Sequence, residues 1–303
     1  MNIIRHRAWF YIFSATLLVV SLLAIFVFGL NYGIDFKGGA IAEIDFLKER
    51  TSVETLRAEI AKAGFADARI QTTGERGILI RLRSINEHEH QQLLVAVAGS
   101  PNPFSVIQEK QFNSIGPTIG AELRRKAYVA IALVLVLILV FVSWAFRHVS
   151  KPVASWKYAI CAIVALGHDV LIPTGVFAVL GRFAGAEVDA LFVTAILTVL
   201  GFSVHDTIVV FDRIRENLRK TPNESFDAIV GRSLKETIGR SITTSFTVFI
   251  VVAALFWFGA DVTRYFALTL LVGVVVGTYS SIFLASPLLV SWHQWSMRKR
   301  AIR

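Results

Sequence analysis

The sequence lacks the motifs of the common soluble enzymes. Its 303 residues contain a single cysteine, Cys161, so disulfide bonds contribute nothing to the fold. No Gly-x-x-x-x-Gly-Lys-Ser/Thr motif occurs, so the P-loop route to nucleotide energy is missing. A Gly-x-Ser-x-Gly elbow and a zinc-binding His-Glu-x-x-His motif are also missing. We therefore expect neither an enzyme acting on covalent bonds nor a resident cofactor or metal.

The alternating pattern of barrel strands is missing as well, and apolar residues instead form long runs. Hydrophobic residues make up 54% of the chain, which is too many for an ordinary soluble domain. A transmembrane helix needs about 20 mostly apolar residues. Six stretches qualify, namely Ala8–Leu30, Ala127–Phe146, Tyr158–Leu180, Ala190–Phe211, Ser241–Phe258 and Tyr265–Leu289. The sequence predicts an integral membrane protein with six helices.

The first run is expected to stay in the membrane, because it exceeds the roughly 7–15 apolar residues of a signal peptide and no small-x-small cleavage site follows it. Orientation follows from Lys and Arg, which accumulate in cytoplasmic loops. With the N-terminus inside, the inner segments hold sixteen of these residues and the short outer loops hold two, Arg182 and Arg264. The sixteen are Arg5, Arg7, Arg147, Lys151, Lys157, Arg213, Arg215, Arg219, Lys220, Arg232, Lys235, Arg240, Arg298, Lys299, Arg300 and Arg303. Both termini are therefore predicted to be cytoplasmic.

The net charge of +9 follows from this asymmetry and suits anionic lipid at the inner membrane surface. No module of interleaved basic and aromatic residues accompanies the charge, so a nucleic-acid partner is not expected.

A polar segment between the first two spans is long enough for a domain of its own. Its patterns predict strands at 40–47, 68–73, 78–83 and 104–112, and helices that begin after the caps Ser52 and Asn86. The order β-α-β-β-α-β is that of a ferredoxin-like α+β fold. The predicted organisation is thus 1–30 (N-terminus and first span), 31–126 (extracytoplasmic domain) and 127–303 (five-helix bundle).

Two histidines of this domain, His88 and His90, have a spacing that could hold a metal ion. Nothing nearby supplies the further ligands of a structural site. We therefore interpret them as two solvated residues at a charged helix start.

Two junctions rich in glycine connect the predicted domain to the spans. They are Asn31-Tyr-Gly-Ile-Asp-Phe-Lys-Gly-Gly39 and Ser114-Ile-Gly-Pro-Thr-Ile-Gly-Ala-Glu-Leu123. Glycine and proline allow sharp turns at low steric cost. The junctions are either simple linkers or segments that determine how the domain tilts against the membrane.

One carboxylate, Asp206, falls inside the fourth predicted span, where a charged group costs at least about 2.5–3.5 kcal/mol. An acid that binds and releases a proton avoids much of this cost, so Asp206 is a candidate for an ion or proton pathway. The fifth span starts on the same side with Arg240 and then Ser241, Thr243, Thr244, Ser245 and Thr247. These hydroxyls either hold a proton wire or simply bond helices together. A nearby Arg240 favours ionised Asp206, so its movement could load and unload a proton.

Three further features of the spans are less specific. Asp169, beside His168 near the middle of the third span, is either a relay partner or a helix-packing group. Asp212 and Arg213 suit an ordinary charge pair at the cytoplasmic boundary. Gly273-Val-Val-Val-Gly277 in the sixth span favours close helix packing.

Taken together, the Gly33–Gly39 motif and Gly201-Phe-Ser-Val-His-Asp-Thr-Ile-Val-Val-Phe-Asp-Arg-Ile-Arg-Glu-Asn217 resemble the SecF family of protein-export membrane subunits. The likeness extends over the six-span layout, the large first loop and the second junction, and so covers nearly the whole chain. The motif positions are Gly33, Asp35, Gly38, Gly39, Gly116, Pro117, Gly120, Asp212 and Arg213.

The resemblance implies a subunit in the bacterial cytoplasmic membrane that pairs with SecD, associates with the SecYEG channel and uses the proton-motive force to promote late preprotein translocation. It also implies a bundle like half of a resistance-nodulation-division transporter, with YajC-like and insertase subunits, the preprotein and lipid as further partners. In the family, an aspartate of the fourth span and an arginine opening the fifth conduct protons together with an aspartate of SecD. The matching residues here are Asp206 and Arg240.

Two other functions stay open as alternatives. A small-molecule exporter of the related class should carry two repeats and two large outer domains, whereas this chain has one of each. A structural scaffold for the translocation channel would not need Asp206 to titrate. The choice between H⁺ and Na⁺ as coupling ion also stays open, because a carboxylate with hydroxyl neighbours suits either.

Overall fold

The computed structural model describes residues 3–147, 153–221 and 223–301, so Lys151 and Arg303 of the charge count lie outside the described residues. The chain divides into two compact units. The helical unit comprises Met1–Asn31 and Val129–Arg303, and the sheet unit comprises Tyr32–Tyr128. The limits of the sheet unit lie close to those of the domain proposed at 31–126.

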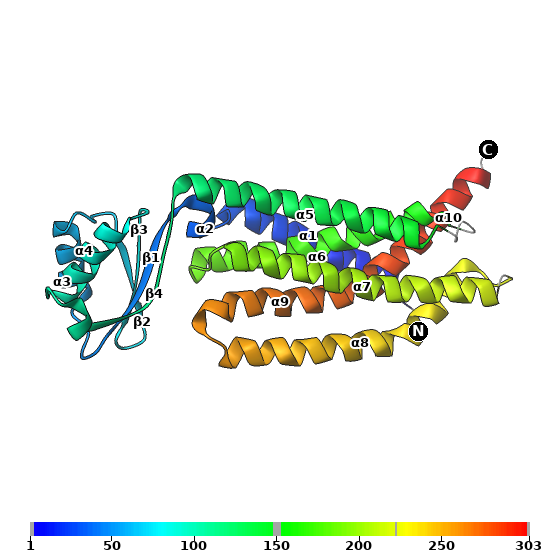
Figure 1. Cartoon of the computed structure of the whole chain (residues 1–303). Coiled ribbons are helices and arrows are strands. Elements are labelled where there is room, and N and C mark those ends of the chain that lie inside the picture. Colours follow the sequence, from blue (N-terminus) through cyan, green and yellow to red (C-terminus); the bar gives the residue numbers. More distant parts are fainter. Residues whose placement is uncertain (1–2, 148–152, 222, 302–303) are drawn as a thin grey trace. The chain divides into compact units, whose positions relative to one another are not determined.

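Within the described residues, six helices are long and apolar enough to cross a membrane (Figure 1). They are α1 (Arg7–Phe28), α5 (Pro117–Ala145), α6 (Ser155–Phe183), α7 (Ala190–Lys220), α8 (Phe226–Phe258) and a continuous helix over Asp261–Lys299. The six-helix prediction is confirmed.

The helices α7 and α8 are longer than the apolar runs that identified them. The connection between the fourth and fifth apolar runs is largely helical, because α7 continues to Lys220 and α8 begins at Phe226. Polar residues extend both helices: Lys220 pairs with Glu216 at 2.6 Å, an i,i+4 contact. Ser225 caps α8 by accepting the Ala228 N–H at 3.4 Å. The length of an apolar run therefore indicates the part of a helix that crosses the membrane, and the helix itself can extend further.

The sixth spanning helix changes its winding in the middle. It consists of α9 (Asp261–Ser280), the π-helical segment η2 (Ser281–Ala285) and α10 (Ser286–Ala301). Pro287 lies two residues after the end of η2, has no N–H to donate and crowds the carbonyl four residues before it. A widened turn at this place accommodates the proline, and such π-bulges are frequent at functional sites.

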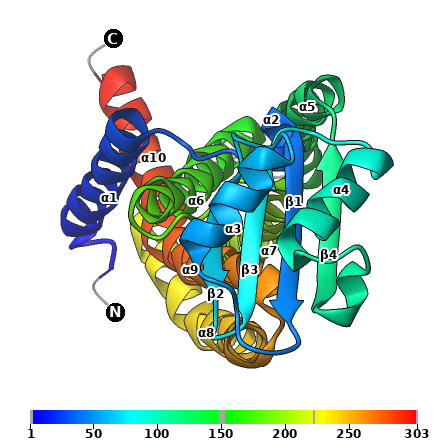
Figure 2. The same cartoon turned by 90° about the vertical axis from the view of Figure 1, so that its left-hand side faces the viewer.

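The sheet unit has the predicted β-α-β-β-α-β order. Its antiparallel sheet has the strand order β2-β3-β1-β4, and α3 and α4 lie across one face of it (Figure 2). The bounds are α2 Ile34–Lys37, β1 Gly39–Phe46, α3 Val53–Lys62, β2 Arg69–Thr73, β3 Gly77–Leu82, α4 Glu87–Ala98, η1 Pro103–Ser105 and β4 Ile107–Ile115. The ferredoxin-like fold is thus confirmed.

The predicted caps act as expected, but the last strand is displaced. Ser52 accepts the Thr55 N–H at 3.2 Å, and Asn86 forms a capping box with Glu89. The fourth strand was predicted at 104–112 and this was wrong, because Pro103 instead opens the short helix η1. The strand therefore starts later and runs directly into the second glycine junction.

His90 also departs from the expectation of two solvated histidines. It is 5% exposed, its ring stacks on Phe112 with centroids 3.6 Å apart, and its Nε2 lies 2.7 Å from Oε1 of Glu109. His88 is exposed as expected. A flat ring fits the apolar layer between α4 and β4 once a carboxylate satisfies its nitrogen. Over the described parts of the chain, no cluster of three His, Cys, Asp or Glu suits a metal ion.

The two glycine junctions pack against each other within the sheet unit. Gly38 has a φ of +79°, and a Cβ there would lie 2.7 Å from Cα of Pro117. A Cβ on Gly120 would lie 2.8 Å from the backbone nitrogen of Gly38. The motifs therefore form one backbone-to-backbone contact in which side chains have no room.

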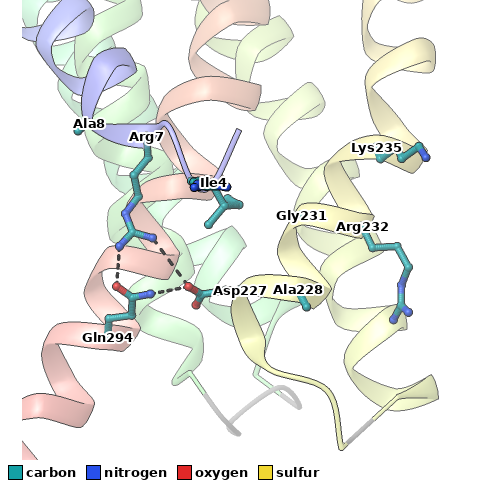
Figure 3. A pocket seen from close by; sticks show the side chains of 10 residues that line it. Ile4, Arg7, Ala8, Asp227, Ala228, Gly231, Arg232, Lys235 and Gln294 are labelled. Atoms are coloured by element: carbon teal, nitrogen blue, oxygen red, sulfur yellow. Dashed lines mark hydrogen bonds and ion pairs between the residues drawn. The ribbon is translucent and has the colours of Figure 1, made fainter. Parts of the chain in front are cut away.

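A polar clamp joins α1 to α8 and α10 in the helical unit. Arg7, Gln294 and Asp227 point toward one another (Figure 3). The Arg7 guanidinium donates to Oε1 of Gln294 at 2.5 Å and lies 3.9 Å from Asp227, and Gln294 donates to Asp227. The clamp borders a cavity of about 800 Å³ that Arg232 and Lys235 also line. Arg232 is paired with Glu224 at 2.8 Å, so much of the positive charge here is compensated within the chain.

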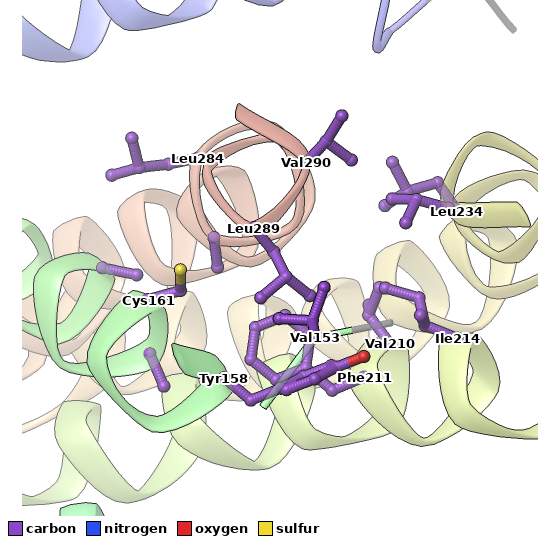
Figure 4. Packing of buried hydrophobic residues seen from close by; sticks show 14 of the residues in the cluster. Val153, Tyr158, Cys161, Val210, Phe211, Ile214, Leu234, Leu284, Leu289 and Val290 are labelled. Carbon is purple, nitrogen blue, oxygen red and sulfur yellow. The ribbon is translucent and has the colours of Figure 1, made fainter. Parts of the chain in front are cut away.

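The main apolar core of the helical unit joins α6, α7, α8 and α10 (Figure 4). Tyr158, Phe211 and Phe146 form its aromatic centre, with the rings of Tyr158 and Phe146 stacked 5.4 Å apart. Leu289 and Val290 of α10 are fully buried in the same cluster. This core fixes the helices next to the intramembrane acids described below.

Gly38→Ala is expected to destabilise the protein more than Gly74→Ala. Both glycines have positive φ, +79° and +60°, so alanine costs about 1–2 kcal/mol of backbone strain at either position. Only the Gly38 variant adds a clash with Pro117, since nothing lies within 4 Å of a Cβ on Gly74. We expect Gly38→Ala to lower the free energy of unfolding by about 3 kcal/mol or more. Denaturant unfolding of the full-length protein in micelles measures this, and equal losses would contradict the junction contact.

Acid is expected to weaken the sheet unit through Glu89. The Arg83 hydrogen bond, followed by that of the Asn86 backbone, lowers the pKa of Glu89 below its ordinary value. Because the pKa of Glu89 is lower in the folded state, ionised Glu89 contributes its full stabilisation above about pH 4.3, the ordinary pKa of glutamate. This stabilisation is lost as the pH falls through the lower folded-state pKa. Melting curves of the full-length protein between about pH 3 and pH 6 should show this loss, and Glu89→Gln should flatten it. An unchanged pH slope in the variant would count against the ion pair.

Candidate functional site

Asp169 of α6 is fully buried and is held by three side chains from three helices. Its Oδ2 accepts hydrogen bonds from Ser203 Oγ of α7 at 2.5 Å and from Ser280 Oγ of α9 at 2.7 Å. Its Oδ1 lies 3.0 Å from Nδ1 of His168. The other nitrogen of His168, Nε2, is buried without a hydrogen-bond partner among the described residues. Asp169 thus joins α6, α7 and α9 at one point.

Asp206 of α7 has a parallel arrangement and is 5% exposed. Its Oδ1 accepts from Ser241 Oγ of α8 at 2.5 Å, and its Oδ2 accepts from Ser281 Oγ at the start of η2. Among the described residues, no Lys or Arg side chain forms an ion pair with Asp206 or Asp169. Hydroxyl groups therefore supply the donors, with His168 as the one titratable contact of Asp169.

Arg240 does not contact Asp206 in this structure, although it directly precedes Ser241, which does. Its side chain is exposed. Arg240 lines a cavity of about 270 Å³ together with Val209, Thr237 and charged residues of α7 and α8. Val209 and Thr237 are one helical turn from Asp206 and Ser241, so this polar cavity lies next to the buried acid. Its role in a proton pathway stays a prediction.

Two further candidates for the proton pathway, Thr244 and Ser245, form no hydrogen bond with either acid. Thr244 donates to carbonyls of its own helix, Arg240 O and Ser241 O, both at 3.0 Å. Ser245 accepts from Thr278 of α9 at 2.6 Å. Both contacts are of the helix-bonding kind, and a proton-conducting role for these residues stays a prediction.

Asp212 and Arg213 do not pair with each other, which corrects the expected charge pair. Asp212 pairs with Arg215 at 2.7 Å. Arg213 pairs with Glu216 and with Glu236 of α8, each at 2.5 Å. Successive residues of a helix point in different directions, so the partners lie one turn away or on the next helix. Arg213 thereby ties α7 to α8, whereas the pair of Asp212 lies within α7.

The glycines of α9 bring it close to α7, as the sequence predicted. A Cβ on Gly273 would overlap Cγ2 of Val199, and one on Gly277 would lie 3.0 Å from Cβ of Ser203. The approach at Gly277 places Ser203 and Ser280 on the same carboxylate oxygen. Small residues at a helix interface allow such contact in membranes.

Sequence reasoning missed Ser203, Ser280 and Ser281 as site residues. Each is fully buried, and each donates to an intramembrane carboxylate. Two signals could have found them. Ser203 lies at i−3 from Asp206 on the same helix face, and Ser280-Ser281 is a polar pair in the middle of an apolar span.

Comparison with known proteins agrees with this architecture. The family described as "Protein export membrane protein SecD/SecF, C-terminal" matches residues 100–295, and the "SecD/SecF GG Motif" matches residues 23–46. A protein translocase subunit SecF from Thermobaculum terrenum is 45% identical, with 96% of this chain and 94% of the relative covered. The corresponding protein of Anaerolinea thermophila is 37% identical over 98% and 96% of the two chains. The chain belongs to the SecF family.

Solved structures give the same result. A crystal structure of SecDF, a translocon-associated membrane protein from Thermus thermophilus, matches with a TM-score of 0.80 at 33% identity over 96% of this chain. A super-membrane-facing form of SecDF matches with a TM-score of 0.66 at 32% identity over 99% of this chain. The chain spans only 38% and 39% of the lengths of these SecDF chains. The family and the six helices identify a multi-pass membrane protein.

Gly273→Ala is expected to force α9 away from α7. Overpacking of a tight contact typically costs about 1–3 kcal/mol, and the added methyl meets Val199 directly. The second substitution Val199→Ala removes the overlapping atoms and should restore part of the lost stability. Thermal unfolding in micelles measures both variants. A Val199→Ala change that only adds to the damage of Gly273→Ala would contradict this contact.

Proposed function

We propose that the chain is a subunit of the Sec protein-export machinery that, together with a SecD partner, uses the proton-motive force to promote late preprotein translocation. Membership of the SecF family and similarity to the solved SecDF chains support the assignment to protein export. The observation that carries the proton-driven part is Asp206, a carboxylate buried in a spanning helix with serine hydroxyls as its donors.

A hydroxyl shell suits an acid that changes its charge. Hydroxyls donate to the ionised carboxylate and can accept from the protonated one, because each carries a donor and free lone pairs. A buried ion pair with arginine would instead hold the acid ionised. Asp206 can therefore take up a proton without leaving a buried donor or acceptor unpaired.

Arg240 is proposed to control when this happens. It lines the polar cavity of about 270 Å³ one turn from Asp206, where water and protons can gather. An approach of its guanidinium favours proton release from Asp206, and its withdrawal into the cavity favours uptake. Alternation between these positions couples proton passage to movement of the bundle.

The energy is sufficient for a movement of this kind. One proton crossing 100 mV releases about 2.3 kcal/mol, and each unit of pH gradient adds about 1.4 kcal/mol. A few protons can therefore shift a protein between two states that differ by a few kcal/mol.

The proposed setting is the bacterial cytoplasmic membrane with both termini inside and residues 31–126 outside. The excess of Lys and Arg on the predicted inner side supports this orientation. Proposed partners are SecD, the SecYEG channel, the preprotein and lipid, with YajC-like and insertase subunits as further candidates. Arg213 is proposed to keep α7 and α8 together, since it pairs with Glu236 across them, while Asp212 pairs with Arg215 within α7.

Asp206→Asn is expected to abolish the part of export that depends on the proton gradient. The amide keeps the shape of the carboxylate but cannot titrate. Export of a preprotein into inverted vesicles that contain the chain with SecD and SecYEG measures this. Loss should be tenfold or more, on the order of removing a group essential to proton transfer.

Asp261→Asn is the matched control, because Asp261 is an exposed acid at the start of α9, and it should leave export unchanged. A purely structural scaffold predicts normal export by Asp206→Asn in a normally assembled complex. That result would refute the proposed proton-driven function. Imposing a Na⁺ or an H⁺ gradient alone in the same vesicles identifies the coupling ion.

A further inference from the structure

Two serines adjacent in sequence serve the two buried acids. Ser280, the last residue of α9, donates to Asp169, and Ser281, the first residue of η2, donates to Asp206. Neighbouring Cα atoms are about 3.8 Å apart. The two carboxylates, which come from α6 and α7, are therefore held by one short piece of a third helix.

Each of these hydroxyls has a second acceptor within its own helix. Ser280 Oγ lies 3.1 Å from Gly277 O, and Ser281 Oγ lies 3.0 Å from Thr278 O. A serine has one proton to donate. When the carboxylate is ionised the proton points to it, and when the carboxylate is protonated the hydroxyl can turn to the carbonyl and accept the carboxyl proton. The geometry thus accommodates both charge states of both acids.

Asp169 has further features of a titrating group. His168 beside it is 1% exposed, and its Nε2 has no hydrogen-bond partner among the described residues. A buried imidazole nitrogen without a partner is costly in a purely packing role. It is explained if water or a proton reaches this nitrogen during the working cycle.

Resting on the function proposed above, we propose that Ser280 and Ser281 couple Asp169 to Asp206, and that Asp169 is a second proton-binding carboxylate of the chain. Two carboxylates bound by adjacent residues of one helix in an apolar bundle repel each other when both are ionised. Uptake of a proton by one acid therefore favours release by the other, as in coupled titrations. In each uptake step, a proton passes from water to a carboxylate, so one O–H bond of the water breaks as the O–H bond of the carboxyl group forms. In each release step, the same transfer runs in reverse.

Other titratable or charged groups near the cluster come from each packed helix. They are His205 on α7, Arg240 on α8, His168 on α6, Tyr279 on α9 and Tyr11 on α1. Tyr11 bonds Ser291 of α10 at 2.9 Å, and the Tyr279 hydroxyl accepts from Ser14 of α1 at 3.2 Å, so neither hydroxyl bonds an acid. The Tyr279 ring stacks on His168 with centroids 6.1 Å apart. His205 is exposed, as is Arg240. The two serines are the direct link between the carboxylates.

Infrared difference spectroscopy of the chain in complex with SecD, titrated with pH in vesicles, tests the coupling. Among the carboxyl bands that change with pH, Asp169→Asn and Asp206→Asn should each remove one band of the parent protein. Removal of either acid should shift the titration midpoint of the other by about one pH unit or more. Ser280 and Ser281 are positioning residues. Ser280→Ala should shift the titration midpoint of Asp169, and Ser281→Ala that of Asp206, each by a similar amount.

Ser286→Ala is the matched control. Ser286 is equally buried and is the first residue of α10, directly after the π-segment, but it donates to Ser281 O at 3.3 Å and bonds no carboxylate in the described structure. It should leave both bands in place. If Asp169→Asn fails to assemble, Ser280→Ala and Ser203→Ala report on Asp169 without removing it.

The coupling is overturned if Asp169→Asn removes no titrating band, or if it leaves the Asp206 midpoint unmoved. Either result is distinct from failure of the proposed function, which shows itself as normal proton-driven export by Asp206→Asn. If that export is lost while Asp169→Asn is silent in the spectrum, the proton-driven function stands and the second site does not.

Discussion

The burial of two carboxylates among hydroxyl donors is the constraint on which the helical unit depends. Each bond to Asp169 and Asp206 from Ser203, Ser241, Ser280 or Ser281 crosses a helix interface. Hydrogen bonds between membrane helices contribute only about 0.6 kcal/mol each, which is small beside the cost of an acid at bilayer depth. The cluster therefore fixes the relative positions of α6, α7, α8 and α9 more than it stabilises them. The presence of two buried carboxylates in this bundle is better explained by a functional role than by helix packing.

The close approach of the backbones makes this shell possible. Gly273 and Gly277 let α9 lie against α7 at Val199 and Ser203, and a serine side chain is too short to bridge a wider gap. The π-segment ahead of Pro287 begins with Ser281, at the point where the winding of the helix changes. A regular α-helix places successive side chains about 100° apart. A widened turn directly after Ser280 changes that angle, so adjacent residues can meet acids on two different helices.

Much of the fold follows from local patterns, and the exceptions have physical causes. Apolar length identified the six spanning helices, and the caps Ser52 and Asn86 with the period of alternation identified the sheet unit. The extensions of α7 and α8 were missed because salt bridges such as Glu216–Lys220 replace hydrophobicity outside the apolar layer. Asp206 and Asp169 could be found from sequence because charge is rare in apolar runs. Of their serine partners, Ser241 was named from the sequence, whereas Ser203, Ser280 and Ser281 were missed because a serine in a span is common. The structure distinguishes Ser281 at a carboxylate from Thr244 bonded to its own helix.

The position of Arg240 suits a switch better than a permanent ion pair. A guanidinium fixed on Asp206 would hold that acid ionised at every pH of interest, and proton uptake would then require breaking a buried pair at a cost of several kcal/mol. In this structure Ser241 occupies that contact, while Arg240, its neighbour on α8, lies in the charged cavity beside Asp212 and Glu236. Under the proposed function, a rotation or slide of α8 would exchange Ser241 and Arg240 at this contact. One proton crossing 100 mV supplies about 2.3 kcal/mol, so the charge of a single carboxylate would then bias the position of a helix.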